Sequence, residues 1–580
     1  MSAIATISPA EQASEQALAA VYACLEHGEH FLLEAGAGAG KTYSLVQALR
    51  FLIERHAVKL VRRYQKVACI TFTNVAKEEI ESRIDRDPLI YCDTIHGFCW
   101  SLVGGFQKQL RAQLPSMPHW PERIEEAGGI ADQTVEYSLG YRSINDRQIS
   151  LHHDDVLLLT AKLFENEKFR RIVSSRYPII LIDEYQDTNA NWVAGVKEHF
   201  LATRGSSQFG FFGDHWQKIY GDGCGRIEHP ALHLINKHAN FRSVLTVVEC
   251  LNRMRPELPQ FVKDPTEVGS VRVFHTNGWV GTRQTGAHWG GDLPSEVAHA
   301  ALQGVKATLQ EDGWDLSAAA TKILMLTHRV LATEQGYRTL PQIFRFNEAF
   351  TKKEHAHIAF FVDHLEPAVE AFAAKRFGAM FGALDYKASP IAASGDKKRW
   401  ASSMNELSAL RTNGTIGQVI DHLRATRRPQ LPDDVEQRER ELDKFDAGSG
   451  EEIPLPLEEL KKLRNVPYSE IVALAGYHRG YSPFETKHGV KGAEFENVLV
   501  VIGRGWSMYN FGEMLELAAD VSHLPSNRRE AFERNRNLFY VACSRPKKRL
   551  AILFTQKLSV QALATVEKWF GPETVESLVL

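Results

Sequence analysis

The sequence concentrates its most recognisable chemistry in residues 35–42, the run Ala-Gly-Ala-Gly-Ala-Gly-Lys-Thr. Because it follows the apolar residues 31–33 and precedes a helical pattern, it predicts a turn between a strand and a helix. Such a turn points backbone N–H groups at a polyphosphate, with Lys41 on the β- and γ-phosphates and the Thr42 hydroxyl on Mg²⁺. Taken alone, the run also fits a turn that only permits tight strand–helix packing. The predicted phosphate-binding residues are Ala35 (where the usual pattern has glycine), Gly36, Ala37, Gly38, Ala39, Gly40, Lys41 and Thr42.

Two adjacent acids, Asp183 and Glu184, end the apolar run 179–182. A strand would deliver both carboxylates at its carboxyl end, where they suit two roles: Asp183 on Mg²⁺ and Glu184 polarising an attacking water. The alternative is a solvated loop after a strand. Because a candidate phosphate-binding turn lies upstream in the same chain, the catalytic interpretation is favoured. The two stretches together predict the binding of a polyphosphate with Mg²⁺.

The elements that must position these residues alternate between apolar bursts and helical patterns. Helical stretches follow most of the bursts, as in α/β layers that bind ligands at the carboxyl ends of their strands. Residues 105–150 and 341–470 break this rhythm, and we interpret both as helical insertions into α/β domains. Buried parallel strands are predicted at residues 67–72, 178–183, 209–213, 322–326 and 498–502.

The composition is typical of a globular protein with several domains. Of the 580 residues, 44% are hydrophobic and 24% are charged, and the net charge is −3, so a partner such as DNA must be met by a local basic groove. The seven cysteines form no C-x-x-C pair, which disfavours a zinc or iron–sulfur site and is typical of a reducing compartment. We see no signal peptide and no apolar run near the ~18 residues of a membrane span. We therefore expect a cytoplasmic protein without a membrane partner.

Eight motifs follow one another along the chain: AGAGAGKT (35–42), TFTNVAKEEIESRI (71–84), DTIHGFC (93–99), LIDEYQDTN (181–189), GDHWQKIY (213–220), NFRS (240–243), ETKHGVKGAEF (485–495) and RNLFYVACSR (536–545). In these motifs and their order the sequence resembles UvrD/Rep-type superfamily 1 helicases, over roughly residues 8–555 apart from the two insertions. The resemblance implies an α/β fold with two RecA-like parallel-sheet P-loop domains, each carrying a small, mainly helical accessory insertion, and ATP bound between them.

The predicted domain division follows from the resemblance. The first RecA-like domain comprises residues 1–104 and 151–232, interrupted by a short helical accessory insertion at 105–150. The second comprises residues 233–340 and 471–580, interrupted by a helical accessory insertion at 341–470.

The resemblance also implies roles in catalysis for three further residues. Gln217 would sense the γ-phosphate or position water, and Arg242 and Arg545 would be arginine fingers on the transition-state charge. An isolated Arg242 or Arg545 would more often form a surface ion pair of little consequence. Only their place in the order of motifs favours the catalytic interpretation.

The resemblance also implies which residues recognise the adenine and the ribose, although one of these positions differs from the family. Phe241 matches the aromatic residue that stacks on adenine, Glu494 matches a residue near the ribose, and either Gln12 or Gln16 would read the adenine edge. Where close family members have arginine after Lys-Thr, this sequence has Tyr43. Tyr43 and Phe241 would then sandwich the base between two aromatic rings.

A track for single-stranded nucleic acid is also implied, since such motors need aromatic platforms and phosphate anchors. The matching positions are Phe72, Asn74, Thr94, His96, Tyr220, Thr486 and His488. Asp222 stands where the family usually has a base-stacking tryptophan, and Trp216 cannot be assumed to replace it. The run 152–155, His-His-Asp-Asp, is better interpreted as the start of a helix than as a metal site.

Three functions remain open from the sequence. The leading one is an ATP-dependent helicase or translocase whose hydrolysis is stimulated by DNA and which moves 3′-to-5′ on single-stranded DNA or a 3′-tailed duplex. The second is an ATPase subunit that regulates or feeds a partner nuclease in anti-phage defence of the Gabija kind, with little unwinding alone. The third is a nucleotide-gated DNA-binding scaffold, which the intact set of catalytic residues disfavours. RNA as the track is not excluded, because stacking platforms do not read the sugar.

Overall fold

The computed structural model describes residues 7–580 except 138–141, 204, 220, 286–289, 326–335, 346–347, 352, 386–389, 447–452, 480–483, 486–492 and 504–508. Its contacts divide the chain into two compact units. The first unit comprises Met1–Arg272, Tyr509–Leu550 and Ser559–Val575, and the second comprises Val273–Met508, Ala551–Leu558 and Glu576–Leu580.

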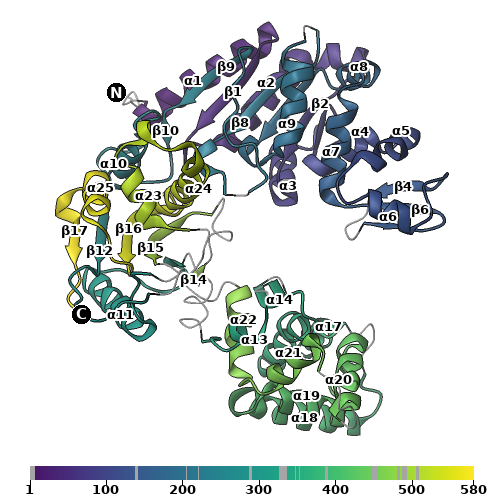
Figure 1. The fold of residues 1–580 in the computed structure, drawn as a ribbon, viewed down its shortest axis with the longest axis vertical. Helices are drawn as coiled ribbons and strands as arrows, with labels where there is room; N and C mark the ends of the chain where they lie inside the picture. The colour runs from purple at the N-terminus through teal and green to yellow at the C-terminus, as the bar shows by residue number, and fades with distance from the viewer. Residues whose placement is uncertain are drawn as a thin grey trace, which may run out of the picture. The chain divides into compact units, whose positions relative to one another are not determined.

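A six-stranded sheet forms the centre of the first unit, with the strand order β3-β2-β7-β8-β1-β9 and every neighbouring pair parallel (Figure 1). Each of the predicted strands at 67–72, 178–183 and 209–213 is confirmed. The strands are β1 (His30–Ala35), β2 (Val67–Thr71), β3 (Ile90–Thr94), β7 (Ile179–Asp183), β8 (Gln208–Gly213) and β9 (Leu232–Lys237).

Helices cover both faces of this sheet, which explains why its strands are continuous apolar runs rather than alternating ones. Side chains such as Phe31, Cys69 and Leu181 pack against one set of helices, and their strand neighbours Leu32, Ala68 and others pack against the second set. The first set is α1 (Pro9–His27), α2 (Lys41–Arg62) and α3 (Asn74–Arg83). The second set is α4 (Ile95–Val103), α7 (His153–Leu163), α8 (Glu167–Arg176), α9 (Ala190–Val196) and the π-helix η3 (Lys197–Leu201).

The first unit also contains segments that the sequence assigns to the second RecA-like domain. They are β10 (Ala239–Asn240), α10 (Leu245–Met254), β11 (Phe261–Val262), α23 (Phe511–Leu517), η6 (Val521–His523), α24 (Ser526–Cys543), α25 (Val560–Phe570) and η7 (Pro572–Thr574). Helices α10, α23, α24 and α25 pack on one another. The motifs NFRS and RNLFYVACSR therefore share a compact unit with the phosphate-binding turn, while the predicted four-part domain division stays a prediction.

The first insertion contains strands that the sequence analysis missed. Alongside α5 (Gln107–Gln113), η1 (Leu114–Ser116) and α6 (Pro121–Glu126), it forms a three-stranded sheet, β4-β6-β5. The strands are β4 (Thr134–Tyr137), β5 (Ser143–Ile144) and β6 (Gln148–Leu151). They are short and mostly polar, so they lack the apolar run that marks a buried strand. Their inward residues Val135 and Ile149 join the core that also buries Trp120.

The sequence prediction for residues 152–155 is confirmed. His152 caps α7: its ring accepts from the Asp154 amide, and its own backbone N–H donates to Asp155 Oδ2 at 2.9 Å. Arg142 adds an ion pair to the buried Asp155 carboxylate at 2.9 Å. This segment is therefore the start of a helix.

The second sheet has the order β14-β13-β15-β16-β12-β17, and β13 pairs in parallel with both β14 and β15. The predicted strands at 322–326 and 498–502 are confirmed as β13 and β15. The strands are β12 (Ser270–His275), β13 (Thr321–Met325), β14 (Phe484–Glu485), β15 (Phe495–Ile502), β16 (Pro546–Phe554) and β17 (Val575–Ser577), and the helix α11 (Ser295–Glu311) packs on them.

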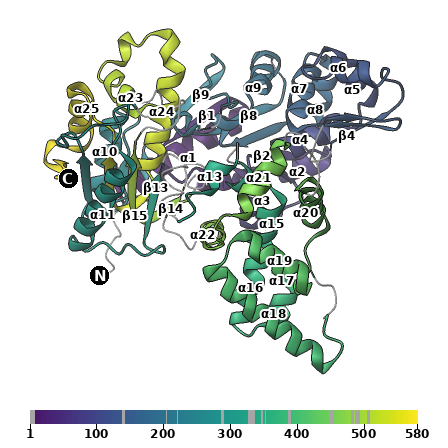
Figure 2. The ribbon, with the colours of Figure 1, turned by 60° about the horizontal axis from the view of Figure 1, so that its bottom comes forward.

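The regular elements that the structure describes between residues 340 and 478 are all helices, as predicted, and they bury a core of their own (Figure 2). The elements are α13 (Leu340–Ile343), α14 (Glu348–Thr351), α15 (Ala356–Ala359), η5 (Phe360–Leu365), α16 (Glu366–Ala373), α17 (Phe377–Ala383), α18 (Ser394–Asn413), α19 (Ile416–Thr426), α20 (Asp433–Asp446), α21 (Leu455–Arg464) and α22 (Ser469–His478). Among the described residues of the whole chain, none of the helices is long and apolar enough to cross a membrane. The fold is α/β with substantial helical content, as predicted.

Candidate active site

Three adjacent strands bring the predicted catalytic segments to one edge of the first sheet. Strand β8 lies between β1 and β7, and all three are parallel, so their carboxyl ends meet. The phosphate-binding turn follows β1, Asp183 and Glu184 end β7, and Gln217 follows β8 in a short 3₁₀ turn, η4 (His215–Gln217). This edge is where parallel α/β sheets bind their ligands.

The turn after β1 adopts the backbone that its glycines predict. Gly38 and Gly40 both have φ of 72°, and Gly40 is the residue before the first turn of α2, which begins at Lys41. A Cβ atom on Gly38 would come within 2.8 Å of Arg242 Cβ, so glycine is needed there for space as well as for its positive φ. The turn is held from outside by Asn240 Nδ2 and Gln260 Nε2, each donating to the Ala37 carbonyl at 3.1 Å.

Glu184 and Lys41 face each other across the site. Lys41 Nζ lies 3.5 Å from Glu184 Oε2, and Glu184 adopts a left-handed backbone with φ of 48°. Such a conformation is uncommon for a residue with a side chain and is found at functional sites. Gln186 Nε2 donates to Glu184 Oε2 at 2.6 Å and Gln186 Oε1 accepts from the Asp214 amide at 3.1 Å, which holds the Glu184 carboxylate in place.

The two residues predicted to be arginine fingers, Arg242 and Arg545, lie close to each other. Arg545 is 1% exposed, and its NH2 donates to Gln217 Oε1 at 3.4 Å, while Arg242 NH1 donates to the Ser544 carbonyl at 3.1 Å. Burial and the neighbouring charge of Arg242 lower the pKa of Arg545, and Glu184 opposes this effect. Two neighbouring guanidinium groups create a field that favours an anion such as a phosphate.

The residues predicted to hold Mg²⁺ have the right chemistry for it. The Asp183 carboxylate is 5% exposed at the end of β7, and Thr42 occupies the first turn of α2. A carboxylate and a hydroxyl are hard oxygen ligands, which Mg²⁺ combines with phosphate oxygens and water. Thr42 and Asp183 therefore fit the ion.

The two aromatic rings predicted to sandwich the base lie near one another. Tyr43 and Phe241 are 50% and 40% exposed, and both ring centroids are 5.8 Å from the ammonium of Lys237. Lys237 ends β9, is fully buried and donates to Ser44 Oγ at 2.7 Å and to the Gly40 carbonyl at 3.3 Å. Burial lowers its pKa to about 8. The sequence analysis did not single out Lys237.

This shift predicts a pH dependence of nucleotide binding. Below pH ~8 Lys237 is charged beside the phosphate-binding turn, and as the pH rises through that value the charge is lost. We expect the KM for ATP to rise roughly 3-fold or more between pH 7.5 and 9 in the wild type, because an attraction for phosphate disappears. In Lys237→Met, KM should be high at both pH values. Steady-state ATPase assays across this range test this.

Lys353→Met provides the matched control for that experiment, because Lys353 pairs with Asp363 at 2.6 Å in the helical part of the second unit. It should keep the wild-type pH profile. A rise in KM that persists in Lys237→Met would contradict the assignment to Lys237.

Four of the residues predicted to line the nucleic-acid track follow two neighbouring parallel strands. Phe72 and Asn74 come after β2, and Thr94 and His96 come at the end of β3, with Thr71 and Thr94 paired in register. Thr94 caps α4 through the Gly97 amide, and the half-buried His96 ring packs edge-on against His153 at 4.8 Å between centroids. Burial, together with the charge of His153, lowers the pKa of His96 to about 4.

The remaining predicted residues are distributed differently. Tyr220, Thr486 and His488 lie outside the described residues. Glu494 belongs to the second unit, one residue before β15, and Gln12 and Gln16 are both exposed on α1. Their roles stay predictions.

Trp216 does not present a face for base stacking. It is 7% exposed, and the guanidinium of Arg536 lies over its ring at 3.9 Å while Tyr540 packs against its edge. Helix α24 also contacts this segment, because Asn537 Nδ2 donates to the carbonyls of His215 and Lys218.

Several polar residues of the site escaped the sequence analysis. Gln186 stands inside the quoted motif LIDEYQDTN, so its position was a signal that could have been used. Asn240 likewise stands inside NFRS. Gln260 and Lys237 lie outside every motif, and only the folded chain shows that they contact the turn.

The class of protein that this site indicates is a P-loop nucleotide hydrolase of the α/β type. A family model described as "AAA domain" matches residues 17–222, which contain the phosphate-binding turn and both acids. This match covers the first sheet apart from its last strand.

Among curated proteins, the chain is similar to Gabija protein GajB from Bacillus cereus (strain HuB5-5), with 23% identity over 95% of this chain and 97% of that protein. It is also similar to ATP-dependent DNA helicase PcrA from Staphylococcus aureus (strain Mu50 / ATCC 700699) and from Bacillus subtilis (strain 168), with 24% and 26% identity. Both PcrA matches cover 38% of this chain and 37% of PcrA, so the chain spans little more than a third of their length. These likenesses confirm the predicted resemblance to UvrD/Rep-type superfamily 1 helicases.

Proposed function

We propose that this chain is a Mg²⁺-dependent ATPase that couples hydrolysis to 3′-to-5′ movement along single-stranded DNA. The observation that carries the proposal is the convergence of Lys41, Glu184, Gln217 and Arg545 at one edge of the first sheet. The likeness to DNA helicases supports the coupling to DNA, and the polarity is taken from that family. A cytoplasmic location is part of the proposal.

In this mechanism the chain binds and orients the polyphosphate before any bond breaks. The glycine-rich turn and Lys41 hold the β- and γ-phosphates, and binding there competes with the Lys41–Glu184 ion pair. Thr42 and Asp183 would hold Mg²⁺, which would supply positive charge against the phosphates. Glu184 then accepts the proton of the attacking water as the water oxygen bonds to the γ-phosphorus and the bond to ADP breaks.

Gln217 and the two arginines act on the transition state. Gln217 Oε1, an acceptor, orients the water, and Arg242 and Arg545 stabilise the charge that develops on the transferred phosphoryl group. Because these arginines belong to segments other than the strands that carry Lys41 and Glu184, hydrolysis changes contacts between segments. Such a change is what turns chemistry into movement.

The proposal is tested by ATP hydrolysis with and without single-stranded DNA, and by displacement of streptavidin from oligonucleotides biotinylated at either end. We expect strong stimulation by DNA and faster displacement from the 5′ end, which a 3′-to-5′ motor reaches. A rate of ATP hydrolysis that does not change when DNA is added would contradict the proposed motor function. Faster displacement from the 3′ end would contradict the proposed 3′-to-5′ polarity. An RNA oligonucleotide of the same sequence tests the nature of the track.

The likeness to a Gabija protein along nearly the whole chain favours a second candidate, an ATPase subunit that serves a partner nuclease in anti-phage defence. In that case the chain alone should hydrolyse ATP but unwind a 3′-tailed duplex poorly, and a neighbouring gene should encode a nuclease. Adding the purified nuclease should then change unwinding or cleavage. Efficient unwinding by the isolated chain, unaffected by that nuclease, would favour the autonomous motor.

A further inference from the structure

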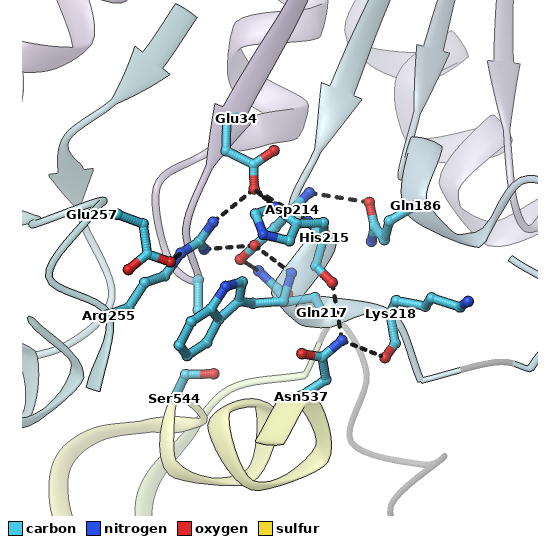
Figure 3. Close-up of polar contacts among 12 residues, drawn as sticks. Glu34, Gln186, Asp214, His215, Gln217, Lys218, Arg255, Glu257, Asn537 and Ser544 are labelled. Carbon is cyan, nitrogen blue, oxygen red and sulfur yellow. Dashed lines mark hydrogen bonds and ion pairs between the residues drawn. The ribbon is translucent and has the colours of Figure 1, made fainter. Parts of the chain in front are cut away.

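Arg255 is a buried arginine outside the eight motifs, and it contacts residues that adjoin the candidate active site. Arg255 follows α10 and is 2% exposed, and Figure 3 shows it among the carboxylates of Glu34, Asp214 and Glu257. Its NH1 donates to Asp214 Oδ1 at 2.6 Å and its NH2 donates to Glu34 Oε1 at 2.7 Å. Both carboxylates are buried, so the guanidinium fork connects two groups that water cannot pair.

Asp214 divides its two oxygens between Arg255 and Gln217. Oδ1 accepts from Arg255 and from the Trp216 amide, and Oδ2 accepts from Gln217 Nε2 at 2.7 Å. A carboxylate that binds the nitrogen of a side-chain amide fixes which way the amide faces. The carbonyl oxygen of Gln217 is thereby left on the other side, where Arg545 donates to it. This orientation is the one in which Gln217 can accept a hydrogen bond from water.

Glu34 connects Arg255 to strand β1, which leads into the phosphate-binding turn. It is the penultimate residue of β1, and its Oε1 also accepts from His215 Nδ1 at 2.7 Å, while its Oε2 accepts from the Tyr185 hydroxyl at 2.6 Å. Burial would raise the pKa of Glu34, but the His215 hydrogen bond and the charges of His215 and Arg255 outweigh it and hold that pKa well below its usual value. Tyr185 directly follows the catalytic candidate Glu184.

Two simpler explanations fit the cluster less well. Glu34, Asp214 and His215 are close enough to ligate a metal ion, but Arg255 already contributes the positive charge between the two carboxylates. A role in stability alone would be served at least as well by apolar side chains, since replacing buried ion pairs with such residues is often neutral or stabilising. Instead, both buried carboxylates that accept from Arg255 adjoin segments with a catalytic assignment, while its third carboxylate partner, Glu257, is half-exposed and lies 3.4 Å from Nε.

We propose that Arg255 is a positioning residue for the proposed hydrolysis: through Asp214 it fixes the orientation of Gln217, and through Glu34 it ties Gln217 to the strand that leads into the phosphate-binding turn. This inference rests on the proposed function, and it adds Arg255 and Glu34 to the residues on which kcat depends. It also predicts that the two act through Gln217 and make no contact with ATP.

The test is a double-mutant cycle on kcat with Arg255→Lys and Gln217→Leu. Lysine keeps the charge but lacks the planar fork that spans two carboxylates. We expect Arg255→Lys to lower kcat about 10-fold with the KM for ATP unchanged, the size of effect typical of residues that orient a catalytic group. In the Gln217→Leu background the same substitution should lower kcat no further, because the amide that Arg255 orients is already gone.

Arg411→Lys is the matched control. Arg411 makes a comparable ion pair with the buried Glu366 at 2.7 Å, in the helical part of the second unit. Its replacement should leave kcat at the wild-type value. Thermal unfolding of every variant separates loss of folded protein from loss of kcat.

The outcomes distinguish this inference from the proposed function. Equal losses of kcat from Arg255→Lys in both backgrounds would overturn the positioning role while leaving the ATPase intact. Wild-type kcat in Gln217→Leu would overturn the assignment of Gln217, and with it this inference, and no hydrolysis by the wild type would overturn both proposals. If Arg255→Lys does not fold, Glu34→Gln tests the same connection from its other end, since it keeps the volume and removes the charge, and it too should be non-additive with Gln217→Leu.

Discussion

Replacing Glu184 with glutamine is expected to lower kcat for ATP hydrolysis by about 10³-fold, since an amide cannot accept the proton of the attacking water. Binding of ATP should survive or become tighter. Glu184 Oε2 lies 3.5 Å from Lys41 Nζ, so the carboxylate competes with phosphate for that lysine, and the neutral amide competes less. Single-turnover hydrolysis gives the first quantity, and equilibrium binding of a fluorescent ATP analogue gives the second.

The replacement of Glu184 by glutamine should preserve the hydrogen bond that this side chain accepts. Gln186 Nε2 donates to Glu184 Oε2, and the glutamine side chain still offers an oxygen in that place. Glu79→Gln is a suitable control, because Glu79 forms only an exposed ion pair with Arg83 one helical turn away, and its loss should change kcat little. Hydrolysis by Glu184→Gln within a few-fold of the wild type would show that another group is the base.

The sheets were predictable because their strands have a strong and local signal. The runs at 67–72, 178–183 and 498–502 are mostly apolar and buried, as expected of strands covered on both faces, and a helix follows each of them. The turn at 36–40 was predictable for a different reason. Gly38 and Gly40 occupy positions with φ of 72°, which few other residues adopt, so the residue types themselves indicate the conformation of the turn.

The polar residues that contact and orient the site residues were not predictable from local sequence patterns. Glu34 lies in an apolar strand, where a sequence pattern offers no partner for it, and Arg255 lies 221 positions further along the chain. Lys237 is similar: a lysine that ends a strand is most often solvated, and only the fold shows that it is buried against Ser44. Contacts between residues so far apart depend on the register and order of strands, which periodicity does not encode.

The secondary structure of the first insertion was also not predictable from local sequence patterns. Strands β4, β5 and β6 have two to four residues each, and they mix exposed, half-buried and buried side chains. A window of that length contains too few positions to distinguish alternation from a polar helix. The region was interpreted as a helical insertion, whereas three strands follow α6.

Replacing Arg545 with lysine is expected to lower kcat by about 10³-fold, the second large effect, because an arginine that stabilises phosphoryl transfer contributes that much or more. The Arg545 guanidinium is fixed on several sides: Nε donates to the Val541 carbonyl, and NH2 donates to Gln217 Oε1 and Ser544 Oγ. A lysine ammonium is a single point charge and cannot make these bonds while also facing the phosphate. The KM for ATP should change much less than kcat, since the stabilised charge develops in the transition state.

Arg253→Lys is the matched control for this prediction, because Arg253 also donates to backbone carbonyls, those of Trp569 and Phe570, without contacting the site residues. It should leave kcat near the wild-type value. Arg545→Lys that raises KM strongly and spares kcat would mean that Arg545 binds ATP in its ground state and is not an arginine finger. Since burial and Arg242 already make the charge of Arg545 costly, a phosphate that arrives there relieves that cost, and the gain is largest when the phosphoryl group carries the most charge.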